Sequence, residues 1–494
     1  MRSTLSTLAC LLSALASCGP MEPDTGMHRH EIRPTDGAGW NGNGYGAVPV
    51  EHWDTPGGKF RIHYATEGRH RPSLIDADAS GAPDFVEEFG KVFDEVYKKE
   101  VTGLGFRPPL DDSKYHDRPD YGGDGRFDVY LQDTAGGDGH VVVEACTSEH
   151  PFICAGYMVV ENDFFGYPYK TPHDGMEVLA SHEFFHIVQN TYRTNVSHNF
   201  SEATAVWMTE QVYPHQDDFD GFMPAFFQSP DRSLDHHLDH SDKFPYGLAI
   251  WAAFLADSYG ADVIRAVWEE LSEKGSSTND LDAIDKVLAR DHESSLAEAY
   301  ATFALWNLMT GKRAAAFSGH KDADKLPEVA LEQIKESALP FRISDTVRHL
   351  AARYYRIKAP KDGWIRVASE RPHPALAVHL VAWPKGPGQA PEVSSALPDA
   401  KTGLCHAEIQ APASGEVLVV AAATSRDTGD LPLSLAVTPT TPPETGGPNP
   451  PPPDETGNGG GDGGCALASQ APPPPPSACL MVLIAVLYGL RRRG

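Results

Sequence analysis

EVLASHEFFHIVQNTY, residues 177–192, carries the strongest chemical pattern in the chain. The apolar residues around its polar centre predict a long, buried helix. On such a helix His182 and His186 stand one turn apart on the same face, so both imidazoles can reach one metal ion. Glu183 lies beside them and can take a proton from metal-bound water. The pattern predicts a zinc site with two histidine ligands and a glutamate general base.

A catalytic zinc ion usually has three protein ligands, so a third ligand is expected elsewhere in the chain. The extended pattern HExxHxxGxxH is absent, because Gln189 takes its glycine position and Tyr192 its third histidine position. We expect Glu202, in a second helical segment, to be the third ligand. Glu210, two turns later on a similar face, and His198 remain alternatives.

Hydrolysis at such a site also needs a group that stabilises the developing oxyanion. Tyr246, at the start of a helix expected over 246–258, is the candidate for this catalytic role. The same position equally suits a half-buried core aromatic. The alternatives are the three histidines of HHLDH (236–240), a segment that could also be an exposed or secondary metal-binding loop: His236, His237 and His240.

The surrounding chain mixes strands with helices. Strands are expected at 59–65, 126–133, 140–145 and 156–163, and helices at 85–101, 176–192, 201–212, 246–258, 261–273, 281–289 and 294–309. Short strands separated by Pro, Gly and Asp turns follow at 354–359, 364–369, 375–383, 416–424 and 431–438. We predict an α+β body with a helical second lobe at 58–338 and a small all-β sandwich at 339–438.

Several motifs in order resemble a myxobacterial family of secreted metalloproteases of the gluzincin type: FRIHY, DADASGAPDFVEE, LGFRPP, GGDGRFDVYL, HEFFHIVQ, EATAVWM and FPYGLAIW. The resemblance covers about residues 58–310. It implies a zincin-like body and peptide-bond hydrolysis, carried by His182, Glu183, His186 and Glu202. In zincins the active-site helix packs beneath a strand whose edge can pair with an extended peptide, and the expected strand 156–163 precedes the helix here.

Residues 76–87, DADASGAPDFVE, follow the ligand schedule of a twelve-residue EF-hand loop. Pro83 departs from that schedule and no entering helix precedes the loop, so an acidic turn that caps the next helix is the alternative. A second acidic turn, 120–128, is a weaker candidate. The expected calcium ligands are the side chains of Asp76, Asp78, Ser80, Asp84 and Glu87 and the carbonyl of Ala82.

Three cysteines lie in the expected folded part. Cys146 and Cys154 are separated by eight positions between two strand-like runs, which predicts a disulfide that closes a hairpin. Metal-binding cysteines favour shorter spacings, so a zinc pair is not expected. Cys405 is left over and is expected to be a buried free thiol.

Both ends of the chain resemble addressing signals. Residues 1–17 read as a lipoprotein signal peptide, and the sequence before Cys18 resembles a lipobox that would direct its lipidation. An ordinary signal cleaved nearby is the alternative. Residues 465–494 contain Cys465, a short apolar run and three arginines, in the order of a MYXO-CTERM sorting tail. A short membrane anchor is the alternative to that tail.

The Gly/Pro-rich segments 18–57 and 439–464 read as linkers. Together with the terminal signals they predict an extracytoplasmic protein at the outer membrane or cell surface, held by a lipid anchor or a sorting tail, or released from it. The disulfide prediction agrees with such an oxidising location.

The chain has 41 Lys and Arg against 68 Asp and Glu, a formal charge of −27. This excess argues against a nucleic-acid partner, because phosphate contacts need clustered cations. We expect a monomeric, secreted or surface-displayed zinc metalloendopeptidase that acts on proteins or peptides and uses zinc and calcium. The alternatives are a non-catalytic calcium-binding surface or adhesion protein, and a zinc hydrolase of a cell-envelope ester or amide.

Overall fold

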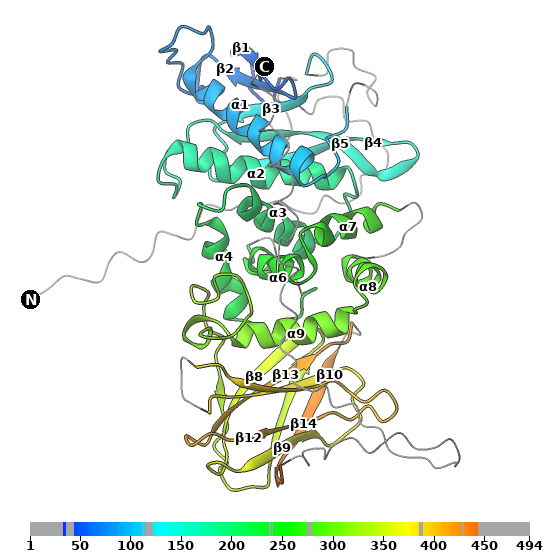
Figure 1. The fold of residues 1–494 in the computed structure, drawn as a ribbon. Helices are drawn as coiled ribbons and strands as arrows, with labels where there is room; N and C mark the ends of the chain where they lie inside the picture. Colours follow the sequence, from blue (N-terminus) through cyan, green and yellow to red (C-terminus); the bar gives the residue numbers. More distant parts are fainter. Residues whose placement is uncertain are drawn as a thin grey trace, which may run out of the picture.

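The computed structural model describes residues 33–35, 44–111, 113, 122–236, 239, 241–273, 279–384, 389–426 and 429–442. These residues form an elongated stack, with a helix-covered sheet at one end, helices in the middle and two sheets at the other end (Figure 1). The predicted α+β class is confirmed. Outside the described residues lie the signal peptide, the sorting tail, most of the second linker, Cys18, Asp120, His237, His240 and Cys465.

The first layer is a five-stranded sheet in the order β1-β2-β3-β5-β4. β2, β3 and β5 run parallel, while β1 and β4 pair antiparallel at the two edges. β2 and β3 are buried along their whole length because both faces of the sheet are covered. The strands are β1 (Val50–Asp54), β2 (Phe60–Ala65), β3 (Phe127–Gln132), β4 (Gly139–Thr147) and β5 (His150–Glu161).

Strand β1 corrects the predicted extent of the first linker, 18–57, because it pairs with β2 along its whole length. Arg33 and Tyr45, also within that range, are buried. Arg33 forms ion pairs with Asp128 at 2.6 Å and Glu144 at 2.9 Å. Tyr45 packs with Tyr130 on the sheet face opposite the helices. These contacts make the segment part of the body.

The expected edge strand is corrected as well. Residues 156–163 fall mainly in β5, which is paired with β3 on one side and β4 on the other. The edge strand next to β5 is therefore β4, while β1 forms the opposite edge. The disulfide between Cys146 and Cys154 joins β4 to β5, which confirms that prediction. Cys405 is buried and free, as predicted.

Two helices cover the face of the five-stranded sheet that lies opposite Tyr45. α1 (Asp84–Tyr97) continues into a π-helical turn, Lys98–Gly103, and α2 (Pro172–Asn190) carries the HExxH pattern. The α2 helix begins with a capping box between Thr171 and Asp174, which satisfies its first free N–H groups. Because α2 lies between the sheet and the helical layer, it is buried on nearly all sides.

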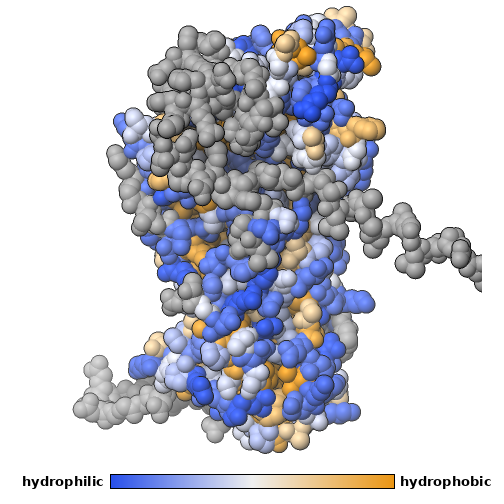
Figure 2. Space-filling view, turned by 180° about the vertical axis from the view of Figure 1, so that it is seen from behind, coloured by the Kyte–Doolittle hydropathy of each residue, from blue (hydrophilic) through white to orange (hydrophobic). Residues whose placement is uncertain are grey.

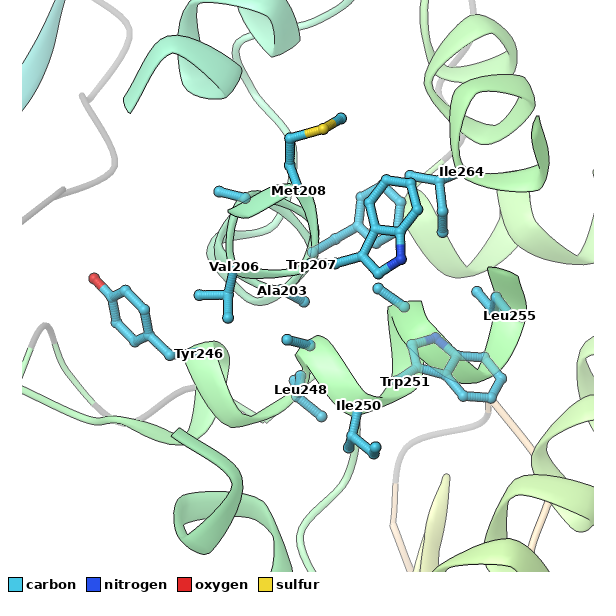
Figure 3. Packing of buried hydrophobic residues seen from close by; sticks show 14 of the residues in the cluster. Ala203, Val206, Trp207, Met208, Tyr246, Leu248, Ile250, Trp251, Leu255 and Ile264 are labelled. Carbon is cyan, nitrogen blue, oxygen red and sulfur yellow. The ribbon is translucent and has the colours of Figure 1, made fainter. Parts of the chain in front are cut away.

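The middle layer contains seven helices among the described residues, packed around Trp207, Trp251 and other large apolar side chains (Figure 3). The single helix predicted over 246–258 is two helices with a junction at Leu248. The helices are α3 (His198–Val212), α4 (Asp218–Phe227), α5 (Phe244–Gly247), α6 (Ala249–Tyr259), α7 (Asp262–Leu271), α8 (Asp280–Asp291) and α9 (Leu296–Leu308).

Two further sheets, β11-β10-β13-β8-β6 and β12-β9-β14-β7, enclose a second apolar core. The outer face of the first of these sheets packs against α9, where the Tyr354 hydroxyl donates to the Ala304 carbonyl at 3.0 Å. The strands are β6 (Glu332–Gln333), β7 (Phe341–Arg348), β8 (Ala351–Lys358), β9 (Trp364–Ser369), β10 (Leu376–Ala382), β11 (Glu392–Ala396), β12 (His406–Gln410), β13 (Glu416–Ala423) and β14 (Asp430–Thr440).

The surface matches the acidic, polar composition: hydrophilic residues cover most of the coloured area seen from behind (Figure 2). Large hydrophobic side chains that stay exposed among the described residues include Ile75 and Phe165. Within the described residues no single helix has the length and apolar character of a membrane span; the pair Phe244–Tyr259 and Asp262–Leu271 meets these criteria jointly but is bent by 112°.

Candidate metal centre

Three predicted zinc ligands meet between α2 and α3. Nε2 of His182 lies 3.2 Å from Nε2 of His186 and 3.2 Å from Oε2 of Glu202. Nε2 of His186 lies 3.6 Å from the same Glu202 oxygen. The histidines come from one face of α2, and Glu202 comes from α3, which packs along it. The structure thus brings these three side chains into one group.

The spacing of these atoms fits a tetrahedral ion. Ligands bound to zinc at about 2.0–2.1 Å in a tetrahedron lie roughly 3.3–3.4 Å from one another. The three measured separations, 3.2, 3.2 and 3.6 Å, bracket that value. Two imidazole nitrogens and a buried carboxylate oxygen each offer a lone pair, and the three atoms lie close enough together to bind one ion. The donor set therefore fits zinc.

Gln189 orients one of the ligands. Its side-chain nitrogen donates to the Ser201 carbonyl at 2.9 Å and to the Thr204 hydroxyl at 3.1 Å, which identifies its oxygen as an acceptor. That oxygen lies 2.9 Å from Nδ1 of His186, so Nδ1 carries the proton and Nε2 keeps its lone pair for the metal. Gln189, which stands where the extended HExxHxxGxxH motif has glycine, therefore links α2 to α3.

Glu202 and His182 stabilise one another electrostatically. Burial opposes the charged form of Glu202, but His186 and His182 hold the pKa of this carboxyl well below its usual range. Burial also opposes the charged form of His182, yet its hydrogen bond with Glu202 raises the pKa of the imidazole. The site therefore favours an anionic carboxylate and a positive charge between the ligands, the arrangement that a cation would complete.

Glu183 lies in a group of buried acidic side chains that the sequence did not identify. Burial raises the pKa of Glu183, while the two histidines of the motif lower it. Burial also raises the pKa of Asp218 to about 6 and raises that of Asp138. Both aspartates interact electrostatically with His182. Asp138 lies just before β4, and Asp218 is the first residue of α4. Strand pairing and helix packing therefore bring both carboxylates close to the residues of α2.

Tyr246 lies beside the metal centre. Its ring stacks against His182 with 6.1 Å between ring centroids, and the ring is buried. The hydroxyl points away from Trp207 and Trp251 (Figure 3). The alternative ligand Glu210 instead forms an ion pair with Lys321 at 3.5 Å. Nδ1 of His198 lies 3.5 Å from Oε1 of Glu202, whereas His182 and His186 contact Oε2 of the same carboxylate.

The predicted calcium loop forms in part. Oxygens of Asp76, Asp78 and Asp84 lie within 4.8 Å of one another, as a cation site requires. Glu87, expected to be the bidentate ligand, instead forms an ion pair with Lys91 at 3.4 Å. The backbone N–H of Ser80 donates to the carboxylates of Asp76 and Asp78, and its hydroxyl also contacts Asp78, so Ser80 acts here as a donor rather than as a free oxygen ligand. The structure thus supports three of the six expected ligands.

The second acidic turn, 120–128, does not form a cation site among the described residues. Asp124 is paired with Arg61 at 3.0 Å. Asp128 is buried in β3, where it contacts Arg33 and the Nε2 of His63, each at 2.6 Å. Arginine side chains therefore neutralise the carboxylates on which this weaker calcium prediction rested.

Comparisons with known proteins add one family match. DUF6055, a family of unknown function, matches residues 169–354, from the cap of α2 into β8. No curated protein matches the chain.

Solved structures with similarity include the periplasmic inhibitors of g-type lysozyme, PliG, of Aeromonas hydrophila and Salmonella Typhimurium. Their sequence identities are 18% and 16%, over 22% of this chain and 96% and 97% of theirs, with TM-scores of 0.18 and 0.16. A family GH115 4-O-methyl-α-glucuronidase with specificity for decorated arabinogalactans has 10% identity over 53% of this chain and 42% of its own, with a TM-score of 0.14. At such scores these likenesses assign no activity to this chain.

Proposed function

We propose that this protein is a zinc metallopeptidase with a zincin-like body of the gluzincin type. The observation that carries the proposal is the meeting of His182, His186 and Glu202 at separations of 3.2–3.6 Å, with Glu183 next to the first histidine. Two histidines and a glutamate, with a fourth position left for water or substrate, form a ligand set typical of hydrolytic zinc sites.

Bound zinc would supply a Lewis acid that polarises a carbonyl and lowers the pKa of a water ligand towards about 7. Glu183 would then accept a proton from the attacking water and deliver it to the leaving amine. Because burial raises the pKa of Glu183, this carboxylate is a stronger base than an exposed one. Tyr246, next to His182, would donate a hydrogen bond to the developing oxyanion.

The outer strand of the sheet supports a peptide substrate. Among the described residues β4 is paired with β5 alone, so its other edge can accept an extended chain. β4 begins close to α2: a Cβ at Gly139 would lie 2.7 Å from Leu179 and 3.1 Å from the Val159 carbonyl. A larger residue at position 139 would require Leu179 or the start of β4 to shift. Gly139 thereby keeps the start of β4, and the preceding Asp138, next to the candidate metal centre.

We further propose an extracytoplasmic location, at the outer membrane or cell surface, and a structural calcium ion. The disulfide between Cys146 and Cys154 is a feature of proteins in oxidising compartments. The grouped oxygens of Asp76, Asp78 and Asp84 support calcium before α1. Calcium there would hold the loop that leads into the helix.

The peptidase proposal is tested by zinc content and by cleavage of casein and a peptide library. Wild type should bind one zinc per chain and cleave. Glu183→Gln should keep the zinc but lose cleavage by at least about 100-fold, because general-base catalysis contributes about that much. Glu210→Gln is the matched control and should retain both zinc and activity. Zinc-loaded wild type that cleaves no peptide but hydrolyses envelope esters or amides would replace this function with the alternative hydrolase.

A further inference from the structure

A cavity lies beside the first sheet, formed by side chains other than the zinc-ligand candidates. Its volume is about 420 Å³. It opens where the parallel neighbours β3 and β5 end, at Gln132 and Glu161. The carboxyl ends of parallel strands are common ligand positions, because the chain turns away there and leaves a crevice. The cavity is of a size that suits a small ligand or a side chain.

The lining of the cavity is acidic. It holds three carboxylates, Asp133, Glu161 and Asp163, and one cation, Arg69. The formal charge of these groups is therefore 1 − 3 = −2. Within the described part of the chain none of the three carboxylates forms a salt bridge, although one oxygen each of Asp133 and Asp163 accepts a backbone N–H of its own turn, so their negative charge is not neutralised by a cation of the protein.

Glu161 shows that one side of the cavity is built for a donor. The residue is only 3% exposed. Its Oε2 accepts hydrogen bonds from the Thr134 N–H at 3.0 Å and the Thr134 hydroxyl at 2.6 Å, and it lies 3.1 Å from the Tyr167 hydroxyl oxygen. Its Oε1 accepts none from the described residues and is not sealed in the core. A buried carboxylate oxygen is stabilised when a ligand donor reaches it.

The arrangement favours an organic cation over a metal ion. Oxygens of Asp133, Glu161 and Asp163 do not meet within 4.8 Å, unlike the two groups of described residues that do. A metal ion needs such convergence, whereas a guanidinium or ammonium group on a flexible stem does not. Phe165, which lines the cavity and is 88% exposed, adds an aromatic face on which a cation can rest.

The cavity is joined to the metal centre through the start of β4. The Tyr167 hydroxyl donates to the Gly137 carbonyl at 2.6 Å, and the Glu161 N–H donates to the Asp138 carbonyl at 2.8 Å. Asp138 in turn interacts with His182 and Glu183. We propose that this cavity is a specificity subsite that takes a lysine or arginine side chain of a peptide substrate. The choice of a peptide rests on the proposed peptidase function.

The first test is binding without cleavage. Zinc-loaded Glu183→Gln protein is titrated with pairs of fluorescent peptides that differ only by lysine or norleucine, placed at each position in turn. At one position lysine should bind about tenfold tighter, the gain of one charge-assisted contact. The advantage should shrink as salt is raised, because the cavity is open to solvent.

Three further substitutions on the same background locate the effect. Glu161→Gln removes the charge but keeps an oxygen for Thr134 and Tyr167, so it should abolish the preference for lysine. Asp163→Asn, at an exposed residue, should weaken the preference and serves if the first variant fails to fold. Glu332→Gln, an exposed carboxylate of β6, should leave it unchanged. Equal binding of both peptides at every position, or a lysine preference that Glu161→Gln or Asp163→Asn leaves undiminished, would overturn the subsite.

Cleavage of the same peptides by zinc-loaded wild type separates the subsite from the peptidase proposal. Faster cleavage of lysine peptides, through a lower KM, supports both. Cleavage of both peptides at equal kcat and KM overturns the subsite and leaves the peptidase standing. Absence of cleavage together with a lysine preference in binding overturns the peptidase, and leaves a cation-binding cavity.

Discussion

Glu100 is a carboxylic acid buried in the core with no hydrogen-bond partner. It lies in the π-helical turn after α1 and is 0% exposed, and neither Oε1 nor Oε2 has a partner among the described residues. Burial raises the pKa of Glu100 well above its ordinary value of 4.5, and the nearby His186 opposes this only in part. The folded protein therefore holds Glu100 as the neutral acid.

This burial predicts a specific dependence of stability on pH. Because the folded pKa is raised, the favourable state of Glu100 is fully present below pH 4.5 and its contribution is lost as pH rises. Each pH unit up to the folded pKa costs about 1.4 kcal/mol. Glu100→Gln keeps the shape of the side chain and removes its titratable proton.

The assay is urea unfolding of metal-free wild type and Glu100→Gln, followed by circular dichroism at pH 5, 6, 7 and 8. The difference in unfolding free energy should be small at pH 5 and should grow in favour of the variant by about 1.4 kcal/mol per pH unit until the pH reaches the folded pKa of Glu100. Glu95→Gln, an exposed carboxylate of the same helix, is the control and should show no such trend. A difference that stays constant from pH 5 to 8 would refute the reasoning.

Three other outcomes are expected. Gln189→Leu should weaken zinc binding about 10- to 100-fold, whereas Gln189→Glu keeps an acceptor for the imidazole and should stay within a few-fold; chelator competition measures both, and equal affinities would contradict the orienting role. Replacing Cys146 and Cys154 by serine should lower the unfolding free energy by about 2.5 kcal/mol, the chain-entropy value for so short a loop, and urea midpoints with an unchanged m-value would show it. Burial lowers the pKa of His320 to about 3, so stability should fall by about 1.4 kcal/mol per pH unit below 6.5. His320→Leu should remove that part of the acid sensitivity; an unchanged slope would exclude it.

Local pattern accounts for most elements and for half of the metal centre. The apolar spacing around the HExxH pattern predicts α2, and its i, i+4 geometry places His182 and His186 on one face wherever the helix packs. Because zinc usually has three protein ligands, the sequence predicts a third residue such as Glu202. Only the packing of the helices distinguishes Glu202 from Glu210. The turn of α3 that carries Glu202 faces α2, whereas Glu210, two turns later, forms an ion pair with Lys321.

Weak local signals account for the elements that sequence reasoning missed. β1 is a short strand in a Gly-rich segment, and its pairing with β2 becomes visible only when the sheet is assembled. α4 contains a proline and begins in an acidic run, which resembles a loop. β7, β11 and β12 hold many polar residues, because one face of each is open to solvent.

The sequence by itself determined the α+β class, the disulfide pair, the two histidines and the adjacent glutamate, because each depends on spacing within one or two elements. The tertiary structure decided which glutamate meets the two histidines, the Gln189 bond to His186, the position of Asp138 and the acidic cavity at the end of β5. These join residues from separate strands and helices. The physical reason is that such contacts arise from how layers pack, and packing depends on the whole set of buried faces rather than on any local period.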